Sequence, residues 1–158
     1  LLSVAVDAVA DTRARAPERV IAVRSLTEPP WEDASPTVLG DEARLHQVAT
    51  NLLSNAVQHT PAGTPIEVGV GVRDGGVQMR IVDHGPGIGE GNEERVFERF
   101  FREDPGRSRQ QGGAGLGLAI AWTLVDRHGG TLRHEPTPGG GSTFVVTLSA
   151  TDSGTLRA

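Results

Sequence analysis

The chain has 158 residues, a net charge of −5 from 15 basic and 20 acidic residues, no lysine and no cysteine. This length fits one domain with a sizeable core, and the acidic balance argues against a broad nucleic-acid-binding surface. Disulfides and thiolate metal sites are excluded, which fits a reducing cytoplasm, and no apolar run approaches the roughly 20 residues of a membrane span.

The N-terminal part predicts a helix, a strand and a long loop. Apolar residues at helical spacing predict a helix from about Leu2 that Pro17 ends. The alternation over residues 19–26 predicts a strand, and residues 27–37, which contain three prolines, predict a loop. Residues 38–39 read as a short strand. Because the chain opens within the helical pattern and without a methionine, we expect it to be a fragment of a longer protein.

The middle of the chain predicts a long helix and a hairpin. Asp41 suits a helix N-cap, and the helix is expected to end near His59, because a proline and a glycine follow. Residues 66–72 and 77–82 alternate as strands, and residues 73–76 (RDGG) between them are a strong hairpin signal.

The C-terminal part predicts a loop, a helix and a second hairpin. Residues 89–113 are charged and rich in glycine, and a loop of this length in a compact domain is usually functional or disordered. Residues 116–128 predict a helix capped by the glycines that follow, and residues 131–135 and 142–148 predict a hairpin. Residues 151–158 form a polar tail. The irregular alternation of helices and strands predicts an α+β protein, a two-layer α/β sandwich.

The helix that begins at Asp41 has an apolar and a polar face. The apolar stripe predicts the core side. The opposite face is polar and is either a solvated surface or the lining of a cleft. Its members follow one another at helical spacing and are Arg44, Gln47, Asn51, Asn55 and Gln58.

Four short motifs follow in a fixed order: residues 51–59 (NLLSNAVQH), 83–89 (DHGPGIG), 97–102 (FERFFR) and 113–118 (GAGLGL). Each alone is weak, but the ordered set resembles the N, G1, F and G2 boxes of the ATP-binding domain of sensor histidine kinases. The resemblance covers nearly the whole chain, and implies a catalytic domain over residues 1–150.

This resemblance implies the Bergerat (GHKL) ATP-binding fold, in which helices cover a mixed, mostly antiparallel sheet. A mobile lid would span about residues 89–113. The expected ligands are ATP and Mg²⁺.

The resemblance also assigns roles in the first and third boxes. Asn55 would bind Mg²⁺, a hard cation for which one carboxamide oxygen plus phosphate oxygens suffices. Asn51 stands where the related Hsp90 and MutL ATPases carry a glutamate that activates water, and an amide cannot take that proton. His59 would lie against the nucleotide, and Arg102 would reach the γ-phosphate. Gln58 departs from the family, which commonly has a phosphate-binding lysine there.

The second box would bind adenine. Asp83 would accept a hydrogen bond from the exocyclic amine of adenine, whereas guanine presents an oxygen there and would be repelled. The glycines permit positive φ and close approach of the ligand. An alternative is a tight turn with Asp83 as its Asx cap. The further nucleotide contacts in this box are expected at Gly85, Gly87, Ile88 and Gly89.

The fourth box opens a helix whose free N–H groups suit a polyphosphate. A dinucleotide-binding fingerprint is excluded by the G-x-G-x-G spacing and the lack of a preceding strand, and a P-loop by the absence of lysine. Nucleotide contacts are expected at Gly113, Ala114, Gly115, Leu116, Gly117 and Leu118.

The sequences around His46, His128 and His134 do not match the context of a phosphoacceptor histidine. We therefore expect the acceptor on a separate dimerisation domain of the same parent, with a response regulator as the final acceptor. The parent is expected to be a homodimer anchored in the bacterial membrane, with this domain in the cytoplasm. The alternatives are an anti-sigma-factor serine kinase of the same superfamily and a degenerate nucleotide-binding module.

Overall fold

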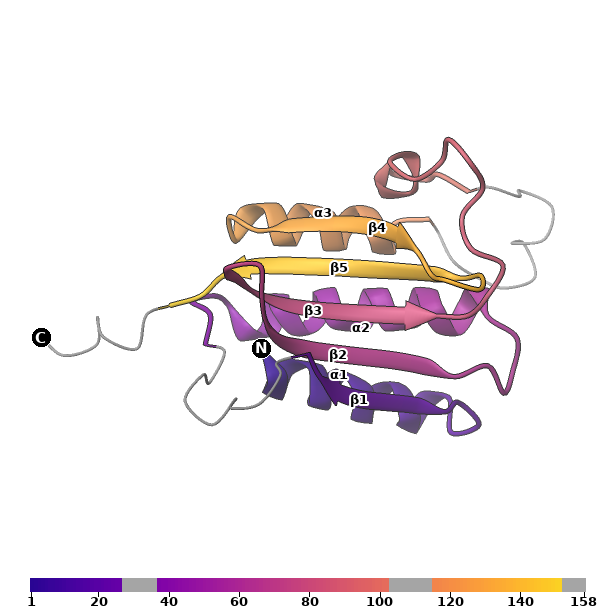
Figure 1. The fold of residues 1–158 in the computed structure, drawn as a ribbon, viewed down its shortest axis with the longest axis horizontal. Helices are drawn as coiled ribbons and strands as arrows, with labels where there is room; N and C mark the ends of the chain where they lie inside the picture. Colours follow the sequence, from indigo (N-terminus) through magenta and orange to yellow (C-terminus); the bar gives the residue numbers. More distant parts are fainter. Residues whose placement is uncertain (27–36, 103–114, 152–158) are drawn as a thin grey trace, which may run out of the picture.

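The computed structural model describes residues 1–26, 37–102 and 115–151. These residues form two layers, a five-stranded sheet and three helices that cover one of its faces (Figure 1). The helices are α1 (Leu2–Arg15), α2 (Glu42–His59) and α3 (Gly117–Arg127). The strands are β1 (Ile21–Ser25), β2 (Ile66–Arg73), β3 (Gly76–Asp83), β4 (Thr131–Pro136) and β5 (Ser142–Ser149). The predicted α+β sandwich is confirmed.

The strand order is β1-β2-β3-β5-β4, and the sheet is mixed but mostly antiparallel. Only β1 and β2 pair in parallel, with Ile21 opposite Ile66; the other neighbours are antiparallel. The C-terminal ends of β3 and α2, the N-terminal end of α3 and the β4–β5 turn therefore meet at one end of the molecule, on the right in Figure 1.

The core lies between the sheet and the three helices. The apolar stripe of α2 is fully buried, as the sequence predicts, and the central strands contribute Val68, Met79, Ile81 and Phe144. At roughly 1.5–3 kcal/mol for each large apolar side chain, this burial is the main stabilising contribution.

Local turn chemistry explains the ends of the elements. Asp41 caps α2 by accepting a hydrogen bond from the backbone N–H of Arg44 at 3.1 Å. Asp74 and Gly75 have φ angles of 52° and 77°, which matches a two-residue type I′ hairpin turn between β2 and β3. Gly129 ends α3 with a φ of 67°. These predicted caps and hairpins are confirmed.

Two local predictions are wrong, namely the strand over residues 38–39 and the bounds of the first strand. Residues 38–39 form no strand, and Leu39 is 87% exposed. The strand predicted over residues 19–26 is shorter, because the N–H of Arg19 closes a turn onto the carbonyl of Ala16 instead of entering the sheet. The first tail residue, Thr151, is tied to the carbonyl of Thr37 by its N–H and its hydroxyl, at 2.9 and 3.0 Å.

The loop predicted from residue 89 contains one turn of 3₁₀ helix at Arg95–Phe97. No helix within the described residues is long and apolar enough to cross a membrane.

Candidate nucleotide-binding site

The polar face of α2 meets the start of α3. Asn51, Asn55 and Gln58 are half-buried on this face, and His59 is exposed at its end. The Asn51 amide nitrogen donates to the backbone carbonyl of Gly117 at 3.2 Å. The first and fourth sequence motifs, 66 residues apart, are thus joined directly.

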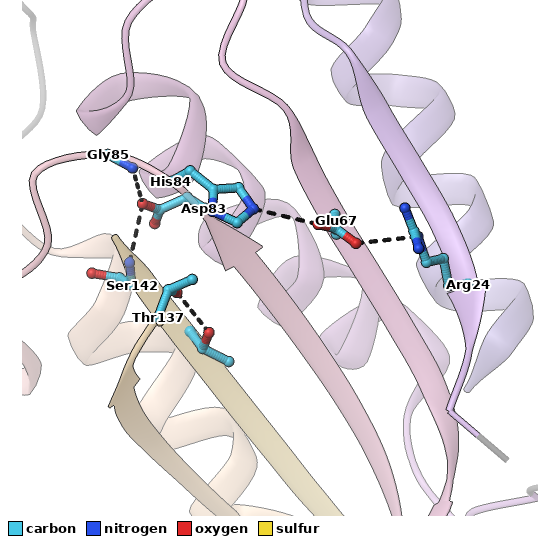
Figure 2. Close-up of polar contacts among 8 residues, drawn as sticks. Arg24, Glu67, Asp83, His84, Gly85, Thr137 and Ser142 are labelled. Carbon is cyan, nitrogen blue, oxygen red and sulfur yellow. Dashed lines mark hydrogen bonds and ion pairs between the residues drawn. The ribbon is translucent and has the colours of Figure 1, made fainter. Parts of the chain in front are cut away.

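Asp83 is a buried carboxylate at the end of β3, and only 4% of it is exposed. Its Oδ1 accepts two backbone hydrogen bonds, from Gly85 at 3.0 Å and from Ser142 at 3.2 Å (Figure 2). Its Oδ2 has no hydrogen-bond partner among the described residues. The two donors therefore fix the carboxylate and leave one oxygen able to accept a hydrogen bond from a ligand.

The turn after Asp83 packs against the end of α2. A Cβ atom on Gly85 would lie 2.9 Å from the carbonyl oxygen of His59 and 3.0 Å from Cγ2 of Thr60. Only glycine permits this approach, so the first and second motifs are also in contact. The Asx-type bond from Gly85 to Asp83 shows that the turn interpretation and the ligand interpretation of Asp83 are compatible.

The β4–β5 turn also lies at this end of the site, although it belongs to none of the four sequence motifs. Gly141 has a φ of 110°, and a Cβ atom there would lie 2.0 Å from the carbonyl oxygen of Asp83. The two strands that the turn joins are also linked, since the buried hydroxyls of Thr137 and Thr143 are 2.8 Å apart (Figure 2). The signal that could have found this turn is the run of three glycines immediately before the last strand.

The third and fourth motifs also touch. The backbone N–H of Phe100 donates to the carbonyl of Gly115 at 2.9 Å, and Gly115 has a φ of 66°. Phe97 packs edge-on against Phe144 in the core, with ring centroids 6.2 Å apart, which anchors this segment to the domain. Phe100 instead is 70% exposed.

The start of α3 offers backbone donors. Its N-cap, Leu116, makes no side-chain capping bond, so the first N–H groups of this 11-residue helix are not capped by a side chain. Ile88 and Leu118 are half-buried against the core, whereas Gly89 is exposed.

The described geometry gives three of the predicted residues no partner in the site. Gly113 and Ala114 lie outside the described residues. Arg102 is half-buried and is the last residue described before that gap. No hydrogen bond joins Arg102 to another described residue.

An exposed chain of charges runs beside Asp83. His84 Nε2 lies 3.3 Å from Glu67 Oε1, and Glu67 Oε2 lies 3.1 Å from Arg24 Nε (Figure 2). Such solvent-exposed pairs typically contribute about 0–1 kcal/mol. They link β1 and β2 to the residue that follows β3.

The comparison with known families decides the class of this site. Residues 40–152 match the family described as "Histidine kinase-, DNA gyrase B-, and HSP90-like ATPase". The chain belongs to this family. The match includes all four motifs, and it confirms the expectation of a GHKL-type ATP-binding domain.

Individual members of the family are similar over most of the chain. The sensor-like histidine kinase SenX3 of Mycolicibacterium smegmatis is 45% identical over 111 residues, which is 70% of this chain and 29% of SenX3. The solved structure of the mycobacterial sensor histidine kinase MprB has a TM-score of 0.75 at 30% identity, covering 94% of this chain and 95% of that one. The solved structure of full-length ShkA in complex with AMPPNP has a TM-score of 0.76 at 31% identity, covering 99% of this chain and 32% of that one.

The chain thus spans less than a third of the length of the curated relatives it matches, since the shares for SenX3 and for the probable sensor kinase TcrY of Mycobacterium tuberculosis are 29% and 27%. Those relatives therefore contain further domains.

Proposed function

We propose that this chain is the ATP-binding catalytic domain of a sensor histidine kinase. It holds Mg–ATP and presents the γ-phosphate to a histidine on a separate dimerisation domain of the same parent. The phosphoryl group then passes to an aspartate of a response regulator. The similarity to SenX3 and MprB supports this assignment within the broader family.

One observation favours phosphotransfer over hydrolysis. Asn51 faces the start of α3 and donates to the Gly117 carbonyl. At this place a hydrolytic member of the family would need a carboxylate to deprotonate water, and an amide cannot do this at neutral pH. A neutral imidazole already carries a lone pair on one ring nitrogen, so a histidine acceptor needs no such base. A serine hydroxyl would need one, which disfavours the serine kinase alternative.

The site residues fit a magnesium ion. Asn55 lies one turn beyond Asn51 on the same face of α2, and its carboxamide has no hydrogen-bond partner among the described residues. Its oxygen can complete the coordination of an ion held mainly by phosphate oxygens and water. When bound, Mg²⁺ would neutralise charge on the phosphates. The chain itself contributes mainly orientation.

The remaining nucleotide contacts follow from the same geometry. Oδ2 of Asp83 would accept a hydrogen bond from the adenine amine, and the first N–H groups of α3 would face the phosphates. Arg102 would approach the γ-phosphate. Gln58 supplies a hydrogen-bonding amide but no positive charge.

An apolar groove beside the phosphate end fits the partner domain. The groove has a volume of about 380 Å³ and runs along α3, and its exposed rim includes Phe100 and Ile120. An amphipathic helix that carries the acceptor histidine would bury this apolar surface and bring its side chain near Gly117. We assign the groove to the dimerisation domain of a homodimeric parent, with the catalytic domain on the cytoplasmic side of the membrane.

Radiolabelling tests this function. Incubated alone with Mg²⁺ and γ-labelled ATP, the chain is expected to bind nucleotide, to label none of its five histidines and to hydrolyse ATP very slowly. Adding the dimerisation domain of the parent is expected to give acid-labile, base-stable label on that domain. Rapid hydrolysis by the chain alone would favour an ATPase, and acid-stable label on a partner serine would favour the serine kinase. Failure to bind nucleotide would favour a degenerate module.

A further inference from the structure

Arg19 is a buried arginine whose partners are backbone carbonyls. It lies in the turn between α1 and β1, and only 8% of it is exposed. Its Nη1 donates to the carbonyl of Pro61 at 2.5 Å, and its Nη2 donates to the carbonyl of Thr60 at 2.6 Å and to that of Val57. The carboxylate of Glu18 is 4.0 Å from Nε and is mostly exposed, so it compensates the buried charge only weakly.

These three carbonyls belong to the C-terminal end of α2 and the residues that follow it. The last four carbonyls of a helix have no partner within the helix, and a cation there also interacts favourably with the helix dipole. The carbonyl of Ala56 is satisfied by the hydroxyl of Thr60 at 2.7 Å. Thr60 itself is extended, with φ −115° and ψ 144°. Side chains, and mainly that of Arg19, therefore cap the C-terminal end of α2 by binding its carbonyls. They also set the direction in which the chain leaves the helix.

The same end of α2 is one wall of the nucleotide site. The backbone of Gly85 packs so closely against His59 and Thr60 that a Cβ atom on it would clash with both. The N–H of Gly85 in turn holds Oδ1 of Asp83. A continuous set of contacts thus leads from Arg19 through the end of α2 to the carboxylate proposed to bind adenine.

We propose that Arg19 is a positioning residue for nucleotide binding. By donating to three carbonyls at once, its guanidinium fixes the last turn of α2, which carries Gln58 and His59, against the turn that follows Asp83. The spacing between the magnesium and phosphate end of the site and its adenine end depends on this contact. The inference rests on the proposed function, because it assumes that the bound nucleotide spans both ends.

Arginine is required at this position for a geometric reason. Its planar fork reaches several acceptors at once, whereas the lysine ammonium is a compact point charge on a flexible stem. Arg19→Lys keeps the charge near the helix C-terminus and loses the fork. Arg19→Met keeps much of the side-chain volume and loses both. Comparing the two variants therefore separates the effect of the positive charge from the effect of the planar guanidinium.

Arg13→Met is the matched control. Arg13 also donates from its guanidinium to a backbone carbonyl, that of Ile21, but it is exposed near the C-terminal end of α1 and does not contact α2 through this bond. Its loss removes an equal charge and a comparable hydrogen bond without altering the end of α2.

The experiment measures thermal unfolding, calorimetric affinity for Mg–AMPPNP well below the unfolding midpoint, and the amide NMR resonance of Gly85 without nucleotide. We expect Arg19→Met and Arg19→Lys to bind Mg–AMPPNP about tenfold more weakly, since ligand affinity depends on a preorganised site. The Gly85 resonance is expected to shift in both variants. Arg13→Met is expected to keep the parental affinity and resonance. A purely stabilising role of Arg19 would lower the midpoint alone.

Parental affinity in folded Arg19→Met would overturn the inference and leave the proposed function intact. If Arg19→Met does not fold, parental affinity and an unshifted Gly85 resonance in Arg19→Lys would overturn it equally. A parent chain that binds no AMPPNP would refute the proposed function, and with it the inference.

Discussion

The backbone N–H of Ser142, at the start of β5, donates to Oδ1 of Asp83, at the end of β3, over 3.2 Å. Together with the bond from Gly85 it fixes which oxygen of the carboxylate stays free for a ligand. Ser142, 59 positions away in the sequence, therefore orients the carboxylate that we expect to recognise the nucleotide base.

This orientation predicts the effect of Asp83→Asn. Its side-chain oxygen is expected to keep both backbone donors, so its NH₂ group replaces Oδ2 and faces the adenine amine, donor against donor. We expect ATP binding to weaken by about 1.5–3 kcal/mol and the bias against GTP to relax. Calorimetry with both nucleotides measures this, with Asp126→Asn, at an exposed position of α3, as control. Unchanged ATP affinity in the folded variant would disprove the adenine assignment.

Asn55→Ala tests the metal ligand. Removing the one proposed protein ligand is expected to abolish the difference between ATP affinities measured with Mg²⁺ and with a chelator. The adjacent exposed residue provides the control Ser54→Ala, for which we expect the magnesium dependence of the parent. A variant that binds Mg–ATP as tightly as the parent would place the metal elsewhere.

More of the fold than of the site could be predicted from the sequence, because the contacts that form the site join residues far apart in the chain. The stripe of α2, the cap at Asp41 and the hairpin at Asp74 depend on neighbouring residues, so periodicity and turn chemistry predict them. The bond from Asn51 to Gly117 and the cap that Arg19 places on α2 join distant segments. Local patterns carry no such information.

The order of the boxes predicted which segments gather at the site, because the resemblance supplied the missing long-range information. It did not supply Gly141 or Ser142, which lie outside the four motifs. It also gave no reason to expect the turn at Arg19, where a buried charge overrides the alternation that predicts a strand.

Gln58→Lys tests the departure from the family pattern. The variant restores a cation in the last turn of α2, where it also complements the helix dipole, so we expect no loss of stability. ATP affinity is expected to rise by about 1 kcal/mol, the upper range for a partly exposed charge. Gln47→Lys adds the same charge about three turns earlier on the same face and is expected to leave affinity nearly unchanged. Equal affinity of Gln58→Lys and the parent would mean that other groups already neutralise the phosphates.

Two glycines of the β4–β5 turn offer a matched pair of substitutions. Gly139 and Gly141 have φ angles of 88° and 110°, so alanine is strained at both. At Gly139 a Cβ atom would meet nothing within 4 Å, whereas at Gly141 it would lie 2.0 Å from the carbonyl oxygen of Asp83. Only the second substitution must move the backbone of Asp83, whose carboxylate we propose binds adenine.

We therefore expect Gly139→Ala to destabilise the domain by about 1–3 kcal/mol through backbone strain alone and to keep the ATP affinity of the parent. Gly141→Ala is expected to lower the unfolding midpoint further and, where the protein remains folded, to weaken ATP binding, because its clash displaces Asp83 or Ser142 and breaks their hydrogen bond. Thermal unfolding and calorimetry on the two variants measure both effects. Equal midpoints and equal affinities would show that the β4–β5 turn does not support Asp83.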